Sequence, residues 1–248
     1  MLDNIKLDKD SPIPLYYQLK ELIKSEIKQG HLNYGDMIPS ERELVDVCQI
    51  SRPTVRQAIN ELVTEGMLLK EKGRGTFVAK PKIDQWFLQN LLSFSKEMAL
   101  KGLKPSTKVL KFEAIKTDEE LHKIFGDDCK EVFCLERIRF ADDQPVVVVT
   151  SYIPCHLAPN FLYENLEESS LYELIESKYG HQISHATRVL EAINVFEEDV
   201  KLLKVEPQAS VHLIKTTGYL MNNQPFEYSI ARYRGDNNSF TVTLKYQK

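Results

Sequence analysis

Cysteine is scarce in this chain of 248 residues: there are four, Cys48, Cys129, Cys134 and Cys155, and none shares a CxxC spacing. Zinc sites built on cysteines use CxxC-like spacings, and disulfide frameworks are typical of small secreted chains that are dense in cysteine, so we expect reduced core thiols and no metal site. Long apolar runs are also missing, since nothing approaches the ~18 apolar residues of a membrane-spanning helix. The first residues lack the apolar segment of a secretion signal, which predicts a cytoplasmic protein.

A general excess of positive charge is absent as well. The chain has 32 basic and 36 acidic residues and a net charge of -4. Residues 1–80 hold twelve of each sign. This balance argues against a non-specific polyanion binder, so any nucleic-acid contact must come from a few placed charges. The hydrophobic content of 42% suffices for two modest domains.

The first eighty residues predict three helices and a hairpin. Apolar residues at helical spacing follow Pro14 and stop at Gly30. A second helix begins at Ser40, which forms a capping-box pattern with Glu43. A third begins at Ser51, and residues 67–78 form two short strands joined by a glycine-rich turn. This is the element order of a winged helix-turn-helix domain.

The third helix has an apolar arc for packing and a polar arc that carries Arg52, Thr54, Arg56 and Gln57. Arg52 and Arg56 are four residues apart, so both reach the same stretch of duplex. Arginine pairs in bidentate fashion with guanine or with phosphate. A solvated helix face and an ordinary hairpin are the alternative interpretation of each piece taken alone.

The combined strings are far more specific. Residues 39–44 (PSEREL), 51–58 (SRPTVRQA) and 73–78 (GRGTFV) resemble the DNA-binding domain of the GntR superfamily of bacterial regulators. The resemblance implies DNA contacts at Arg42, Arg52, Thr54, Arg56, Gly73 and Gly75. To these we add Gln57, on the polar arc of the third helix, and Arg74, between the two glycines of the turn. Residues 1–78 would then form the DNA-binding domain, 79–84 a linker and 85–248 a second domain.

Residues 85–248 predict an α+β domain with an antiparallel-rich sheet. We expect helices at 86–100, 117–125 (capped by Thr117 and Glu120), 170–179 and 197–203, and strands at 109–115, 132–141, 146–153, 183–195, 211–221, 226–233 and 240–245. Two expected hairpin turns end in the same Gln-Pro pair, at 142–145 (DDQP) and at 222–225 (NNQP). This weak repeat predicts two related hairpins facing one another around a shared pocket; coincidence of turn chemistry is the alternative.

Arg137 and Arg139 are two residues apart in a strand, so they point to the same face. The partner strand, Val146–Val149, is apolar on both faces, which indicates a covered sheet. Two covered arginines are costly without an anion, and a phosphate satisfies both with charge-assisted hydrogen bonds. The helix start at Ser170 adds a hydroxyl and N–H groups. Salt bridges to acidic residues on an exposed sheet face are the competing explanation.

This second half resembles the HutC-type effector domain of the same superfamily, with a chorismate-lyase-like fold, and is most similar to repressors of N-acetylglucosamine utilisation. The strings are 92–95 (LSFS), 136–139 (ERIR), 169–172 (SSLY), 226–228 (FEY) and 233–236 (YRGD). The resemblance implies a phosphorylated amino sugar held by Phe94, Ser95, Arg137, Arg139, Ser170, Tyr172, Glu227 and Tyr233. In those relatives a glutamate on the second strand of the first hairpin binds sugar hydroxyls, whereas the matching residue here is Val149. The sugar therefore need not be N-acetylglucosamine 6-phosphate.

The expected function is a homodimeric transcriptional regulator, a repressor by resemblance, that binds operator DNA and responds to a sugar phosphate without any cofactor. An enzyme of the chorismate-lyase-like fold acting on a small anion is the alternative. The sequence has no nucleophile elbow and no paired catalytic carboxylates, and its histidines are scattered, which disfavours that alternative. A DNA-binding protein without a small ligand is a third possibility.

Overall fold

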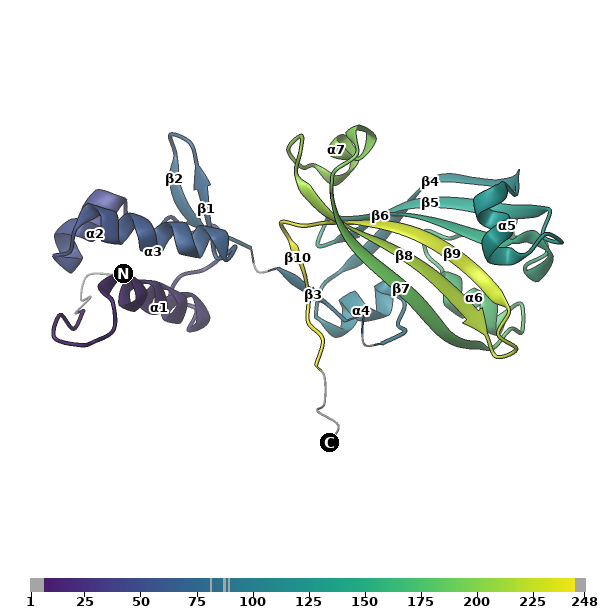
Figure 1. Cartoon of the computed structure of the whole chain (residues 1–248), viewed down its shortest axis with the longest axis horizontal. Helices are drawn as coiled ribbons and strands as arrows, with labels where there is room; N and C mark the ends of the chain where they lie inside the picture. The colour runs from purple at the N-terminus through teal and green to yellow at the C-terminus, as the bar shows by residue number, and fades with distance from the viewer. Residues whose placement is uncertain (1–6, 81, 87, 89, 244–248) are drawn as a thin grey trace. The chain divides into compact units, whose positions relative to one another are not determined.

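The computed structural model describes residues 7–80, 82–86, 88 and 90–243. The chain forms two compact units, and the boundary lies between Lys82 and Ile83. The N-terminal unit contains helices α1 (Leu15–Lys28), α2 (Glu41–Cys48) and α3 (Arg52–Thr64), followed by the hairpin strands β1 (Leu68–Glu71) and β2 (Gly75–Val78) (Figure 1). The expected three helices and hairpin are confirmed. No helix in the described part of the chain has the length and apolar character of a membrane span.

Local capping fixes where the helices of the N-terminal unit begin. The Ser40 hydroxyl accepts from the Glu43 N–H at 3.3 Å, and the Glu43 carboxylate accepts from the Ser40 N–H at 2.7 Å. Both halves of the capping box are therefore present, which satisfies two N–H groups at the start of α2. The Ser51 hydroxyl accepts from the Thr54 N–H at the start of α3. The Ser51 cap therefore fixes where α3 begins after the short turn that follows α2.

One buried cluster and one ion-pair cluster hold α3 in place. The buried cluster joins apolar side chains of all three helices and the hairpin, with Leu19, Val55 and Leu62 fully covered. Lys20 of α1 contacts Glu61 and Glu65 of α3 at 2.7 and 3.2 Å. The apolar side of α3 therefore packs inward, and its opposite side is left to solvent.

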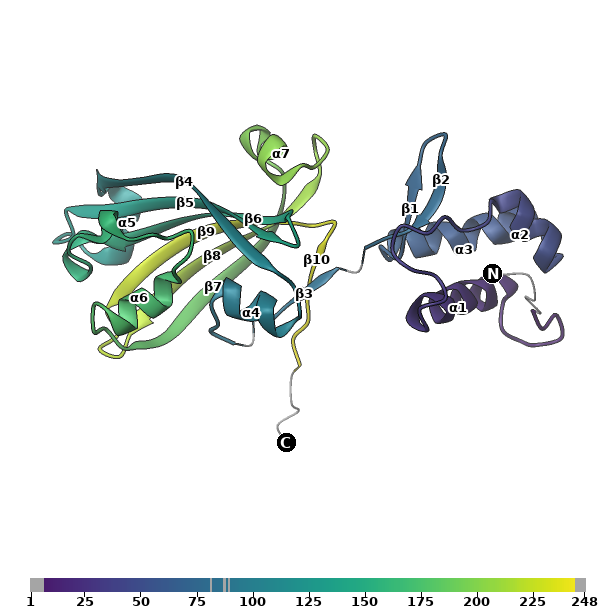
Figure 2. The same cartoon turned by 180° about the vertical axis from the view of Figure 1, so that it is seen from behind.

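The C-terminal unit is built on a six-stranded antiparallel sheet of order β4-β5-β6-β9-β8-β7. Its strands are β4 (Pro105–Lys116), β5 (Glu131–Ala141), β6 (Gln144–Pro154), β7 (Ile183–Asn194), β8 (Ser210–Leu220) and β9 (Pro225–Arg234). Helices α4 (Phe94–Leu100) and α6 (Leu171–Ser177) lie against one face, and α5 (Glu119–Phe125) and α7 (Glu197–Leu203) against the other (Figures 1 and 2). The expectation of an antiparallel-rich α+β domain is confirmed.

The sheet consists of two copies of one β-α-β-β pattern. The first copy runs β4-α5-β5-β6 and the second β7-α7-β8-β9, and they join where β6 pairs with β9. Asp142, Asp143 and Asn223 adopt positive φ in the two hairpin turns, as tight hairpins require. The two hairpins therefore lie side by side in one sheet instead of facing each other as the sequence suggested.

Three sequence expectations are wrong in this unit. The helix expected at 86–100 begins only at Phe94, where the Ser93 hydroxyl caps it; residues 87 and 89 lie outside the described residues. Asp118, and not Thr117, caps α5, while the Thr117 hydroxyl donates to the Cys129 carbonyl at 2.6 Å. The last strand, expected at 240–245, is β10 (Asn238–Phe240), and residues 244 and 245 lie outside the described residues.

The expected linker is shorter than the sequence suggested. Strand β3 (Ile83–Gln85) pairs in parallel with β10, so Ile83 and Asp84 are part of the C-terminal unit. The buried Gln85 amide donates to the Asn238 side chain at 2.7 Å, a contact that local sequence patterns do not reveal because the residues are 153 positions apart. The chain is thus anchored to the C-terminal unit immediately after Lys82.

Candidate functional site

The outer side of α3 carries the candidate DNA-binding face. The side chains of Arg52 and Arg56 are 68% and 54% exposed. They lie with Gln57, Asn60 and other α3 residues along a shallow groove on this side of the helix. Their guanidinium groups are therefore available to a partner and are not part of the core.

A single carboxylate, that of Glu41 on α2, organises this face. Its oxygens lie 3.5 Å from Arg52, 3.4 Å from Arg56 and 3.7 Å from Lys70. Partial burial favours a higher pKa for Glu41, but the charges of Arg56 and Lys70 outweigh it and hold the pKa below its ordinary value. Glu41 thus stays ionised and gathers three cations from α3 and β1 on one side of the unit.

The other predicted DNA-contacting residues are also at the surface of this unit. Arg42, Gln57, Gly73, Arg74 and Gly75 are exposed, and Thr54 is half-buried with its hydroxyl 2.7 Å from that of Ser51. Gly73 and Gly75 have φ of 76° and 132°, which a residue with a side chain adopts only with strain. Arg74 lies between them at the wing tip, paired with Glu71 and stacked near the Phe77 ring. Sequence reasoning missed Lys70, which bonds to Asn60 of α3 at 2.8 Å.

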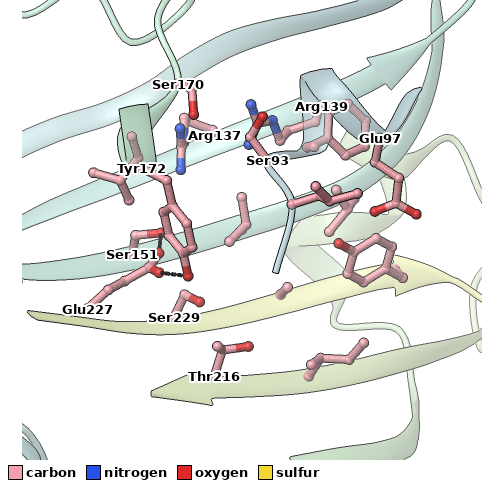
Figure 3. Close-up of a pocket in the computed structure, with 18 of the residues that line it drawn as sticks. Ser93, Glu97, Arg137, Arg139, Ser151, Ser170, Tyr172, Thr216, Glu227 and Ser229 are labelled. Carbon is pink, nitrogen blue, oxygen red and sulfur yellow. Dashed lines mark hydrogen bonds between the residues drawn. The ribbon is translucent and has the colours of Figure 1, made fainter. Parts of the chain in front are cut away.

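The C-terminal unit holds a pocket between the sheet and helices α4 and α6 (Figure 3). Both β-α-β-β copies supply its floor, because inward-pointing residues of β5, β6, β8 and β9 line it. Seven of the eight residues predicted to bind an effector line this one pocket: Phe94, Arg137, Arg139, Ser170, Tyr172, Glu227 and Tyr233. Residues almost 140 positions apart in the sequence are thereby brought together.

Ser95 is the predicted residue that the structure does not bring to the pocket. Ser93 lines the pocket instead, together with Phe94, and its hydroxyl also caps α4 by accepting from the Lys96 N–H at 3.3 Å. On a helix, neighbouring residues point in different directions, so Phe94 and Ser95 do not share a target. The serine that precedes α4 is therefore the one available at the pocket.

Arg137 and Arg139 form the cationic end of the pocket (Figure 3). Arg137 is 3% exposed, and its Nε and Nη1 are buried without a hydrogen-bond partner in the described structure, as is Nε of Arg139. Burial lowers the pKa of both guanidinium groups, and the charge of Arg137 adds to the effect on Arg139, whose pKa falls to about 9. The face of the Phe94 ring lies 4.8 Å from the Arg139 guanidinium carbon. A buried and a half-buried cation, both with buried donors that lack a partner among the described residues, form a site for an anion.

A fixed carboxylate lies on the β9 side of the same pocket. Glu227, 4% exposed, accepts hydrogen bonds from the Ser151 hydroxyl at 2.9 Å and the Tyr172 hydroxyl at 2.8 Å (Figure 3). Burial and the neighbouring Glu227 carboxylate raise the pKa of Tyr172 well above its ordinary value, so its hydroxyl remains a donor. The Glu227 carboxylate is held in one orientation and retains lone pairs for hydroxyl groups of a ligand.

The pocket also contains polar residues that sequence reasoning missed: Ser93, Glu97, Ser151, Arg188, Thr216 and Ser229. Ser151, Ser229 and Thr216 are opposite one another on adjacent strands, so their side chains share the pocket face. The signal for them was strand alternation, because polar residues at inward positions of covered strands need a partner. Val149 lines the pocket directly opposite Arg137, which gives the floor an apolar surface there.

Across the described residues, no group of three or more histidine, cysteine, aspartate or glutamate side chains is arranged to hold a metal ion. The four cysteines are unpaired, and three of them are buried. Burial raises the pKa of the Cys155 thiol to about 11, so this half-buried cysteine is protonated and unreactive near neutral pH.

Comparison with known proteins identifies both units. Residues 15–78 match the bacterial regulatory proteins of the gntR family, and residues 100–238 match the UTRA domain. The HTH-type transcriptional repressor NagR of Bacillus subtilis is 41% identical over 95% of this chain and 97% of its own length. The Mannosyl-D-glycerate transport/metabolism system repressor MngR of Escherichia coli is 28% identical over 92% of this chain and 95% of its own length.

Solved structures agree with this assignment. PhnF from Mycobacterium smegmatis has a TM-score of 0.66 and 25% identity, with 94% of this chain and 99% of the other covered. The gntR match and the two repressors named above confirm the regulator interpretation over the lyase alternative. This chain belongs to the GntR family of bacterial transcriptional regulators, in the HutC subfamily whose members join a helix-turn-helix domain to an effector-binding UTRA domain.

Proposed function

We propose that this regulator is a homodimeric cytoplasmic repressor whose effector is a sugar phosphate bound in the C-terminal pocket. The observation that carries the ligand proposal is the buried Arg137, whose Nε and Nη1 lack partners among the described residues, beside the half-buried Arg139, whose Nε also lacks one. A phosphate accepts from both guanidinium groups at once and compensates their burial. Inorganic anions alone leave the opposite side of the pocket unused.

That opposite side suits a polyhydroxylated ligand. Glu227 offers a fixed acceptor, and Ser151, Ser229 and Thr216 present hydroxyl groups on the same face. Val149 places an apolar surface next to the phosphate end. The proposed ligand is therefore a phosphorylated sugar. A valine at position 149 offers its hydroxyl groups fewer hydrogen bonds than a glutamate at this position would.

The DNA half of the proposal assigns base and phosphate contacts to the arginines on the outer side of α3. In a dimer, each α3 enters the major groove at one half of a near-palindromic operator, while the Arg74 wing tip approaches the backbone or the adjacent groove. The ligand regulates only if it binds one arrangement of the two copies more tightly than another. Since operator DNA is the partner, we place the protein in the cytoplasm.

A thermal-shift series on the full chain tests the ligand proposal. N-acetylglucosamine 6-phosphate and glucose 6-phosphate are compared with the unphosphorylated parents and with inorganic phosphate, for the wild type, Arg137→Met and Lys111→Met. We expect a rise in Tm with at least one sugar phosphate, no rise with its parent sugar, and loss of the rise only in Arg137→Met. Lys111 is an exposed cation on β4 and serves as the control. A Tm rise that survives Arg137→Met overturns the assignment of the phosphate to the arginine pair.

A further inference from the structure

A second pocket adjoins the effector pocket at its cationic end. Four residues line both pockets: Leu92, Ser93, Ser170 and Tyr172. Ser93 and Ser170 lie at the same end of the effector pocket as the guanidinium groups of Arg137 and Arg139 (Figure 3). The place that suits a phosphate is therefore not a closed end, because open space continues beyond it between the starts of α4 and α6.

The two serines at this boundary are hydrogen-bond donors. The Ser93 hydroxyl accepts from the Lys96 N–H at 3.3 Å, and the Ser170 hydroxyl accepts from the Glu173 N–H at 3.4 Å. A hydroxyl that accepts a hydrogen bond still has its own hydrogen to donate. These hydroxyl groups and the arginine donors bind a phosphate through two of its oxygens. Of the other two oxygens, one is bonded to the sugar and one is available for a second ester bond.

The second pocket, which we call the outer pocket, has a lining of its own. It consists of exposed polar residues and two half-buried aliphatic ones: Lys96, Glu173, Glu176, Ser184, Leu91 and Ile183. No ion pair involves Lys96, Glu173 or Glu176 within the part of the chain that the structure describes. Two carboxylates and one lysine give the outer pocket a net negative charge, which favours a cationic group. The ammonium of a small amino alcohol has this chemistry.

We infer that the effector is a phosphodiester that occupies both pockets. The sugar lies in the effector pocket, its phosphate lies at Arg137 and Arg139, and a small amino alcohol esterified to the same phosphate lies in the outer pocket. This inference rests on the sugar-phosphate proposal above and names the form of the phosphate. A phosphate monoester fills the effector pocket alone and leaves Glu173 and Glu176 without a ligand contact.

Isothermal titration calorimetry of the full chain at low ionic strength tests the inference with ligands that share one sugar. The probes are glucose 6-phosphate, its methyl diester and its 2-aminoethyl diester at the phosphate, together with the same three forms of N-acetylglucosamine 6-phosphate. The two diesters have the same phosphate charge, so a difference between them reports on the outer pocket. We expect the 2-aminoethyl diester to bind ~3–10-fold more tightly than the methyl diester.

Two double variants show whether the carboxylates of the outer pocket cause this preference. Glu173→Gln/Glu176→Gln should abolish it, and glutamine at position 176 keeps an acceptor for the Ile183 N–H, which is 3.4 Å from the carboxylate. The control, Glu197→Gln/Glu198→Gln, makes the same change of charge on α7, at the opposite face of the sheet, and should keep the preference. Both variants should bind the monoester alike, which shows that the effector pocket is intact.

The outcomes separate this inference from the proposed function. Equal affinity for the two diesters overturns the inference, as does a preference that survives Glu173→Gln/Glu176→Gln. Binding of the monoester while neither diester binds also overturns it. In each of these cases the sugar-phosphate proposal stands if a monoester binds. An absence of binding for every ligand of both sugar series overturns the two together.

Discussion

The hydroxyl of Tyr172, the second residue of α6, donates a 2.8 Å hydrogen bond to Oε2 of Glu227 on β9. The bond connects the helix above the pocket to the floor below it. The Ser151 hydroxyl occupies the other carboxylate oxygen. Glu227 is therefore positioned by two donors before any ligand arrives. Its negative charge opposes the effect of burial, which lowers the pKa of Arg137.

Replacing Glu227 is predicted to affect phosphate and sugar phosphate in opposite directions. Glu227→Gln removes a negative charge near Arg137, so we expect inorganic phosphate to bind a few-fold more tightly. The same change replaces an acceptor for sugar hydroxyls, and we expect sugar-phosphate affinity to fall by ~10-fold or more. Isothermal titration calorimetry measures both. Tyr172→Phe keeps the charge, so it should leave inorganic phosphate binding unchanged; an equal change for both ligands in Glu227→Gln contradicts the assignment.

Arg52 is predicted to supply base recognition. Arg52→Ala is expected to weaken binding to an operator obtained by in vitro selection by ~1–3 kcal/mol and to relax the base preference at one position of each half-site. Fluorescence anisotropy at matched salt, with operator and scrambled duplexes, provides the measurement. Lys116→Ala removes an exposed cation of the C-terminal unit and should have no effect. Equal affinity of the wild type for the two duplexes would refute base recognition by this face.

Glu41 is predicted to improve the specificity of DNA binding at the expense of non-specific affinity. Its carboxylate contacts Arg52, Arg56 and Lys70 and restrains them in the free protein. Glu41→Gln removes a negative charge that competes with DNA phosphates, so affinity for scrambled duplex should rise and its salt dependence should steepen. The ratio of operator to scrambled affinity should fall. A variant with unchanged affinity for both duplexes shows that the carboxylate has no such role.

The ion-pair cluster between α1 and α3 predicts how the N-terminal unit responds to acid. The hydrogen bond from Lys20 holds the pKa of Glu61 below its ordinary value of 4.5, and that from Lys24 does the same for Glu65. A carboxyl group with a lowered pKa stabilises the fold above its ordinary pKa, and this contribution disappears as the pH falls through the lowered value. Lys20→Met should therefore lower the Tm near neutral pH and have little effect well below pH 4.5.

Thermal unfolding of the wild type and Lys20→Met over roughly pH 7 to pH 3 measures that convergence. Lys116→Met, which removes an exposed cation outside the cluster, is the matched control. A stability difference between wild type and Lys20→Met that is the same at both ends of the range would assign the effect of Lys20 to packing and not to its ion pairs.

Gly218 is predicted to be required for packing beneath Tyr172. A Cβ at position 218 would lie 2.7 Å from Cε1 of the buried Phe226, whose ring packs edge-on against Tyr172 with centroids 5.4 Å apart. Gly218→Ala is expected to destabilise the C-terminal unit by ~1–3 kcal/mol through overpacking. Phe226→Leu removes the atoms in conflict, so the double variant should lose less stability than the two single losses combined. Additive losses would show that the ring moves aside freely.

Sequence patterns predicted the N-terminal unit well because its signals are local. The Ser40–Glu43 capping box and the Ser51 cap lie within three residues of their partners, and the structure has both. The helix expected from residue 86 failed for the opposite reason. Gln85 is fixed by Asn238, from the far end of the chain, and the Ser93 cap then starts a shorter α4. Tertiary pairing thus overrides the local helical pattern.

The pocket shows a similar division. Arg137 and Arg139 were predictable because two cations on one face of a covered strand require an anion. The row formed by Ser151, Ser229 and Thr216 was not, since it depends on the pairing of β6 with β9 and of β9 with β8. Which serine near the start of α4 lies at the pocket depended on where that helix begins, and the structure places Ser93 there in place of Ser95.

The junction of the two β-α-β-β copies determines how a ligand in the pocket affects the stability of the sheet. β6 and β9 pair only from Val147 to Tyr152, and the pocket floor draws on both sides of this short seam. A ligand bound by Arg137 of the first copy and by Glu227 of the second connects the two copies across this pairing. Amide hydrogens along β6 and β9 should then exchange with solvent more slowly in its presence, so the effector would stiffen the whole sheet from its weakest line outward.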